Sequence, residues 1–140
     1  MDAKYAHLKI KILKEDYQYS LLKSNEDLLQ VNSFFKSIKE PVAIFLSDEE
    51  LSLMAPTHLS QNLNTEKAEP GWLCFRIVGP MPFGTVQGLI SNISNVLFRE
   101  QIGVCIVSTF KSDWFFIRSK YQEKAVVLLT NEGWRVEKES

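Results

Sequence analysis

The feature that most constrains the fold is a regular alternation of strand-like and helix-like patterns after residue 71. Residues 72–78 alternate apolar and polar side chains, which is typical of a half-buried strand, and Gly79-Pro80 ends the run. Residues 85–101 then carry the apolar stripe of an amphipathic helix. That stripe consists of Val86, Leu89, Ile90, Ile93, Val96 and Leu97.

The alternation continues with two β-prone runs, residues 104–110 and 113–118, which are separated only by Lys111-Ser112 and therefore predict a hairpin. A second helical stripe begins at residue 121 and stops before Gly133, and residues 134–137 form a last strand. The order strand, helix, strand, strand, helix, strand is that of the ferredoxin-like (βαββαβ) fold. This α+β class predicts an antiparallel sheet with both helices on one face.

The first half of the chain is less regular but contains the same kinds of element. Residues 57–71 are polar, lack a sustained period and end in Pro70-Gly71, so we expect a linker there. The linker would separate an N-terminal domain, residues 1–56, from a C-terminal domain, residues 72–138. In the first domain we expect a hairpin of residues 5–13 and 17–23 around Glu15-Asp16, a short helix at 27–36, a strand at 42–46, a turn capped by Ser47, and a strand at 51–55.

Composition excludes several classes of function. With 45% hydrophobic and 24% charged residues among 140, the chain can bury a core. No apolar run reaches the roughly 18 residues of a membrane helix, and the first residues lack the apolar core of a signal peptide, so we expect a cytoplasmic protein with no membrane partner. The formal charge of −1, with charged residues scattered singly, argues against nucleic acid as a partner.

No group of side chains has the spacing of a catalytic or metal site. Cys74 and Cys105 each lie in an apolar run and are expected to be buried thiols, and His7 and His58 are isolated. The sequence has no G-x-G-x-x-G after a strand, no P-loop and no H-E-x-x-H. We therefore expect no enzymatic activity, no cofactor and no metal.

Three segments of the chain carry a further resemblance, namely Asp48-Glu49-Glu50-Leu51-Ser52-Leu53, Gly79-Pro80-Met81-Pro82-Phe83-Gly84 and Ser108-Thr109-Phe110-Lys111-Ser112-Asp113. They resemble segments of tandem ACT-domain proteins, and in particular of the small bacterial two-ACT family related to the cytosolic arginine sensor of animals. The resemblance implies two ACT-like domains in tandem, of which the first is divergent. It further implies a regulatory protein that binds a free amino acid or similar small zwitterion where two ACT domains meet. Independently, the surplus of aromatic residues and the exposed edges of an open sheet predict a homodimer or larger homo-oligomer.

The ligand residues that this resemblance implies have suitable chemistry. A helix start presents unpaired backbone N–H groups to a carboxylate, and Asp113 offers the opposite charge to an ammonium group. Between Phe83 and Gly88 there is no acidic residue to pair with a guanidinium, so a neutral ligand side chain is favoured over a cationic one. The implied set is Ser52, Leu53, Pro82, Phe83, Gly84, Thr85, Val86, Gly88, Thr109, Phe110 and Asp113.

Simpler interpretations of the same residues remain open. The glycines and prolines of residues 79–84 are equally consistent with a plain turn, Asp113 with a solvated turn residue, and Ser52 with an ordinary strand residue. The alternative function is a ligand-free oligomerisation or protein-interaction module that uses exposed sheet edges. RNA binding through the βαββαβ order of RRM domains is disfavoured, because the aromatic signature and the basic charge are missing.

Overall fold

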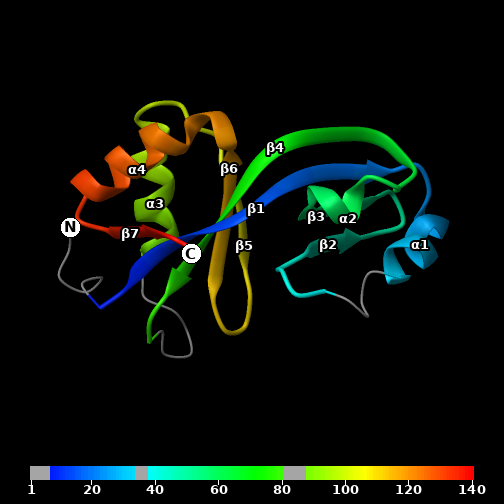
Figure 1. Ribbon diagram of the computed structural model, residues 1–140, viewed down its shortest axis with the longest axis horizontal. Helices are drawn as coiled ribbons and strands as arrows, with labels where there is room; N and C mark the ends of the chain where they lie inside the picture. Colours follow the sequence, from blue (N-terminus) through cyan, green and yellow to red (C-terminus); the bar gives the residue numbers. More distant parts are fainter. Residues whose placement is uncertain (1–6, 34–37, 81–87) are drawn as a thin grey trace. The chain divides into compact units, whose positions relative to one another are not determined.

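The computed structural model describes residues 7–33, 38–80 and 88–140 and forms two compact units (Figure 1). Unit 1 takes its described residues from Met1–Lys14 and Leu73–Ser140, and unit 2 is Glu15–Trp72. Two long strands, β1 (Lys9–Leu22) and β4 (Thr65–Val78), contribute a segment to each unit. The start of the chain, which we assigned to the N-terminal domain, therefore groups with the C-terminal one.

Unit 1 has the expected βαββαβ order, and α3 and α4 cover one face of its sheet (Figure 1). The strand order is β7-β1-β4-β6-β5. β5 and β6 pair antiparallel, which confirms the predicted hairpin. Besides β4, the elements are α3 (Leu89–Phe98), β5 (Cys105–Ser108), β6 (Asp113–Arg118), a 3-10 turn (Ser119–Tyr121), α4 (Gln122–Asn131) and β7 (Arg135–Lys138).

The sheet of unit 1 departs from the expected antiparallel arrangement, because β1 pairs with β7 in parallel. The cause is the apolar alternation at the start of β1, where Leu8, Ile10 and Ile12 are buried in the core of this unit. Lys9 Nζ lies 3.0 Å from a Glu137 carboxylate oxygen across the pair. This hydrogen bond from Lys9 lowers the pKa of the exposed Glu137 carboxyl.

Helix α3 confirms the predicted stripe but is shorter than the predicted helix, residues 85–101. Gly88 has a left-handed conformation, with φ of 77°, and the helix begins at Leu89. Residues 85–87 of the expected helix lie outside the described residues. At the other end Gln101 adopts the left-handed conformation, and the Ile102 N–H donates to the Leu97 carbonyl at 3.1 Å. The buried stripe residues are Leu89, Ile93, Val96 and Leu97.

The core of unit 1 lies between these helices and the sheet. The Phe75 and Phe115 rings, from β4 and β6, stack with centroids 4.8 Å apart. Trp134, which precedes β7, is buried and donates its indole N–H to the Asn92 side-chain oxygen at 2.9 Å, which links the end of α4 to α3. These three aromatic side chains are therefore part of the core of unit 1.

Unit 2 repeats the same order of elements, with strands arranged β2-β3-β1-β4. The predicted strands at 42–46 and 51–55 are present and pair antiparallel, and Ser47 Oγ accepts the N–H groups of Glu49 and Glu50 in the turn between them. The helix predicted at 27–36 is present as a shorter helix, and residues 34–37 lie outside the description. The elements are a 3-10 turn (Asn25–Asp27), α1 (Leu28–Asn32), β2 (Ala43–Leu46), β3 (Leu51–Pro56) and α2 (Thr57–Ser60).

Two predictions for this half were wrong at the level of secondary structure. The segment around Glu15-Asp16, expected to be the turn of a hairpin, is instead the middle of the continuous strand β1. This strand pairs with β7 before that segment and with β3 after it. The expected linker at 57–71 instead contains α2 and the first part of β4. Residues 66–70 are exposed, so this part of β4 has no apolar alternation by which to recognise it.

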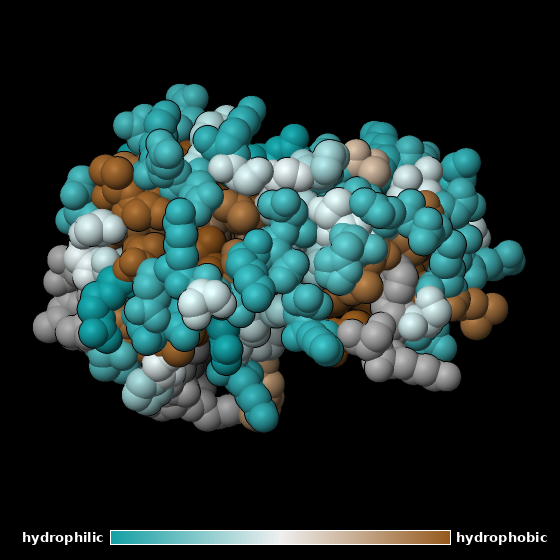
Figure 2. Space-filling view, in the orientation of Figure 1, coloured by the Kyte–Doolittle hydropathy of each residue, from teal (hydrophilic) through white to brown (hydrophobic). Residues whose placement is uncertain are grey.

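Most of the face seen in Figure 2 is hydrophilic, with apolar surface gathered near α3 and α4 and a smaller patch near β2. In the ranges that the structure describes, no helix combines the length and the apolar character needed to cross a membrane.

We predict that Phe75→Ala will lower the free energy of unfolding by about 3–5 kcal/mol, because it removes a fully buried ring and leaves a cavity beside Phe115. Urea unfolding followed by circular dichroism measures the loss. Phe98→Ala, at a ring that is 73% exposed, is the matched control and should change stability by no more than about 0.5 kcal/mol. Equal losses in the two variants would contradict this assignment of the core.

Candidate functional site

The predicted ligand residues fall into three groups. Pro82, Phe83, Gly84, Thr85 and Val86 lie outside the described residues. Ser52 and Leu53 lie on β3 of unit 2, where the Leu53 side chain is fully buried in the core. Gly88, Thr109, Phe110 and Asp113 belong to unit 1.

The hairpin turn between β5 and β6 already uses the hydroxyl of Thr109. Thr109 Oγ1 donates to the Ser112 carbonyl at 2.9 Å and accepts the Ser112 N–H at 3.2 Å. Phe110 is 83% exposed at the tip of the same turn. The structural role of Thr109 is therefore established in the turn itself, and a ligand contact through its hydroxyl would compete with these bonds.

Asp113 is not the solvated turn residue that one interpretation of the sequence expected. It is the first residue of β6, it pairs with Ser108, and only 2% of it is exposed. Because side chains two positions apart share a face of a strand, Asp113 lies on the same side of β6 as Phe115 and Ile117. Its substitution will therefore affect folding as well as any ligand, contrary to our expectation for an exposed turn position.

Gly88 of the predicted site, and Gly79 of the segment 79–84, have structural reasons to be glycine. Gly79 has φ of +134°, and a Cβ there would lie 2.8 Å from the His7 carbonyl oxygen. Gly88 is the left-handed N-cap of α3 and accepts the Asn92 N–H at 2.8 Å. Gly88 has no side chain with which to cap the first N–H groups of the helix.

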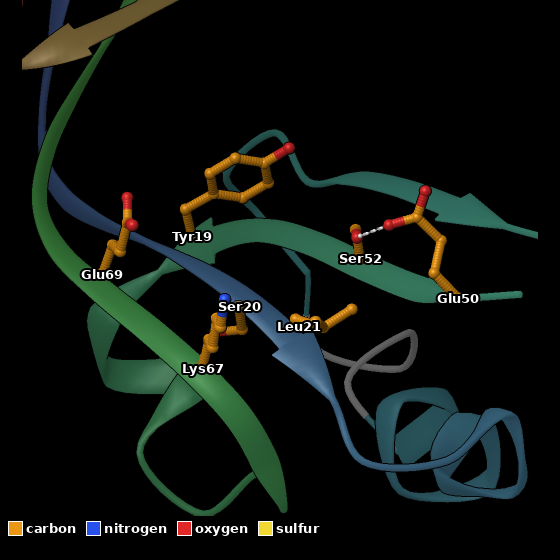
Figure 3. A pocket seen from close by; sticks show the side chains of 7 residues that line it. All are labelled: Tyr19, Ser20, Leu21, Glu50, Ser52, Lys67 and Glu69. Carbon is orange, nitrogen blue, oxygen red and sulfur yellow. Dashed lines mark hydrogen bonds between the residues drawn. The ribbon is translucent and has the colours of Figure 1, made fainter.

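A pocket of about 190 Å³ lies in unit 2, formed by β1, β3 and β4 (Figure 3). Residues two apart on a strand share one face of the sheet. This places Tyr19 with Leu21 on β1, and Lys67 with Glu69 on β4, beside the same space. Ser52 was among the predicted ligand residues, and the others were not. The lining residues are Tyr19, Ser20, Leu21, Glu50, Ser52, Lys67 and Glu69.

The pocket contains both signs of charge together with hydroxyl groups. Glu50 and Glu69 supply carboxylates and Lys67 supplies an ammonium group, while Ser52 Oγ donates to a Glu50 carboxylate oxygen at 2.7 Å (Figure 3). Tyr19 forms one wall and meets Trp72 edge to face, with ring centroids 6.0 Å apart. Such a pocket can bind a small molecule that carries a cationic and an anionic group.

Sequence reasoning missed most of this pocket because Lys67 and Glu69 fall in the segment interpreted as a linker. The sequence places Glu50 only in a segment that resembles a family motif, and Tyr19 only in an expected hairpin strand, so neither is predicted to bind a ligand. Lys67 and Glu69 are two residues apart and are followed by Pro70, a pattern that is equally consistent with an exposed loop and with an exposed strand. No pattern in the sequence predicts that these three distant strand segments lie next to one another.

Comparison with known proteins gives one family and several similar structures. Residues 67–131 match the family model of the ACT domain. No curated protein sequence matches the chain. A protein from Agobacterium tumefaciens is 29% identical, with a TM-score of 0.73, and the similarity covers 96% of this chain and 95% of that one.

Two aspartate kinase structures are also similar. The ligand-free regulatory subunit of aspartate kinase from Thermus thermophilus is 11% identical, with a TM-score of 0.59, over 89% of this chain and 94% of that chain. The aspartate kinase from Synechocystis is 12% identical, with a TM-score of 0.68, over 97% of this chain and 28% of that chain. At these identities the likeness concerns the fold. Together with the family match it confirms the expected ACT-type α+β fold.

We predict that Thr109→Val will lower the free energy of unfolding by about 1–2 kcal/mol, because it deletes both hydroxyl hydrogen bonds of the turn while keeping the shape of the side chain. Urea titration measures the effect. Phe110→Ala in the same exposed turn is the control and should leave stability within about 0.5 kcal/mol of wild type. If Thr109→Val is as stable as wild type, the hydroxyl is not needed for the turn and becomes available as a ligand donor.

Proposed function

We propose that this chain is a non-enzymatic regulatory protein that binds a free amino acid or a similar small zwitterion. ACT domains are regulatory modules that bind amino acids, and residues 67–131 match the model of that family. One of the structurally similar proteins is itself the regulatory subunit of an aspartate kinase. By linkage, a ligand that binds two states of the protein differently shifts the population between them, and this is how such a module would regulate.

The observation that carries the proposal is the mixed charge of the pocket in unit 2. Lys67 and the pair Glu50 and Glu69 lie around one space of about 190 Å³. An α-amino acid has a carboxylate and an ammonium group on the same carbon atom, so it can pair with both signs of charge at once. The carboxylate would meet Lys67 and the ammonium group would meet Glu50 or Glu69, each through a charge-assisted hydrogen bond.

We further propose that the chain contains two ACT-like domains in tandem. The support is topological, since both units follow the order strand, helix, strand, strand, helix, strand. The strands of unit 2 lie in the order β2-β3-β1-β4. The order β5-β6-β4 in unit 1 corresponds to β2-β3-β1 in unit 2, because each run places the second, third and first strands of its unit side by side. The ligand position at an ACT–ACT interface, the homo-oligomer and the cytoplasmic location remain predictions from the resemblance and from composition.

We predict that a thermal-shift screen over the twenty amino acids will identify at least one that stabilises the protein. A ligand present at about 100 times its Kd stabilises the folded state by about 2.7 kcal/mol, which raises the midpoint of unfolding measurably. The binding constant of each hit is then measured by calorimetry. The absence of a shift or of binding heat with every amino acid would contradict the proposed function.

Two substitutions locate the site once a ligand is found. Lys67→Gln should weaken binding about tenfold or more, because a charge-assisted hydrogen bond contributes about 1.5–3 kcal/mol. Lys124→Gln, at an exposed lysine of α4 in unit 1, is the matched control and should bind like wild type. If Lys67→Gln also binds like wild type, the pocket is not the site. A loss in Asp113→Asn, with folding verified, would then favour the residues that the resemblance implies.

A second candidate function is that of an interaction module, and the exposed edge strand β2 favours it. β2 is the end strand of the order β2-β3-β1-β4, so one row of its backbone groups is left without a strand partner in the described chain. Its side chains are also unusually apolar for an edge. Ile44 is 37% exposed, Phe45 62% and Leu46 49%.

We predict that Phe45→Lys will reduce self-association, because a charge on an edge strand opposes pairing with another strand. Light scattering at tens of micromolar should show wild type approaching a dimer or larger species and the variant remaining closer to a monomer. Leu29→Lys, at a leucine of α1 that is 82% exposed, is the control and should behave like wild type. A wild-type mass that stays monomeric at all concentrations would exclude this function through self-association.

A further inference from the structure

We propose that unit 2 carries a binding site for a divalent transition-metal ion, formed by Glu15, Glu40 and His58. One ligand atom from each of the three side chains lies within 4.8 Å of the other two. The three come from separate segments of the chain, namely the middle of β1, the residues before β2, and helix α2. The three side chains are distant in the sequence, so the fold of unit 2 brings them together.

The donor set identifies the class of ion. Two carboxylate oxygens alone would suit magnesium or calcium, but an imidazole nitrogen favours zinc and related transition metals. Zinc sites with three protein ligands keep the fourth tetrahedral position for water. His58 Nε2 lies 3.6 Å from Glu40 Oε1, close to the roughly 3.3 Å that separates two ligands at bond lengths of about 2.0–2.1 Å around a tetrahedral zinc ion.

One buried residue, Tyr17, holds the three segments in place. It follows Glu15 by two positions on β1, and its hydroxyl donates to the Pro41 carbonyl, next to Glu40, at 2.8 Å. The same residue is the strand partner of Pro56, two residues before His58. Tyr17 is fully buried, so this framework is part of the core rather than of a surface loop. The ligands are thus positioned by a rigid support, as a metal site requires.

Electrostatics and access also suit a cation. Two carboxylates held close together repel each other when both are ionised, and a divalent ion between them removes that repulsion. Glu15 and Glu40 are half-buried and His58 is exposed, so the site opens to solvent and an ion can enter. These residues do not line the pocket of unit 2, and the proposal does not depend on amino-acid binding.

Calorimetric titration of the full-length chain with ZnCl2, under reducing conditions, tests this site. We expect one ion per chain with micromolar or tighter affinity, and little heat from MgCl2. His58→Ala and Glu40→Gln should each weaken binding about tenfold or more. The matched control is His7→Ala, which removes the only other histidine of the sequence, and Cys105→Ser removes the more accessible of the two thiols. Both controls should bind zinc like wild type.

Cobalt(II) provides a second readout that does not rely on heat. Its visible absorption should develop on titration of wild type and of His7→Ala, and should be lost in His58→Ala, with circular dichroism showing that each variant is folded. Equal zinc affinities for wild type and His58→Ala would overturn the proposal. So would a loss of binding in Cys105→Ser, or saturation only at millimolar zinc.

Discussion

The pairing of two long strands, β1 and β4, is the constraint on which the rest of the structure depends. Each strand contributes to both units, with Ile10 and Phe75 in the core of unit 1 and Leu22 in the core of unit 2. Figure 1 shows the two strands running in opposite directions. Unit 1 therefore draws its sheet from two separate segments of the chain, whereas unit 2 is the contiguous segment Glu15–Trp72 between them. A cut in residues 65–71 would pass through β4 rather than through a linker.

The two-residue period of these strands also creates the pocket of unit 2. Tyr19 and Leu21 on β1, and Lys67 and Glu69 on β4, present one face of the sheet, and Ser52 adds its hydroxyl from β3 (Figure 3). The other face is used by the core, where Leu22, Leu51 and Leu53 pack under α1. One set of strands therefore supplies stability on one side and polar recognition groups on the other.

Tyr17 has a comparable double role. Its ring is buried, yet its hydroxyl and its backbone reach Pro41 and Pro56, which bring Glu40 and His58 towards Glu15. A residue that appears from sequence to be an ordinary core tyrosine thus determines where three charged side chains meet. The substitution of such a residue would disturb packing and site geometry together, so the ligand residues themselves are the better targets for testing function.

The sequence by itself determined the α+β class, the βαββαβ order of the second half, the buried stripe of α3 and the hairpin of β5 and β6. These follow from local periodicity, which side chains impose wherever one face of an element is buried. Tertiary structure alone decided that residues 7–14 join unit 1, that β1 is continuous, that residues 65–71 form strand, and that Asp113 is buried. Exposed strands such as the start of β4 carry no apolar period, and a single alternating segment such as Leu8 to Ile12 does not specify which core it enters. Strand pairing and core assignment at these positions depend on residues distant in the sequence, so they are determined only in the folded chain.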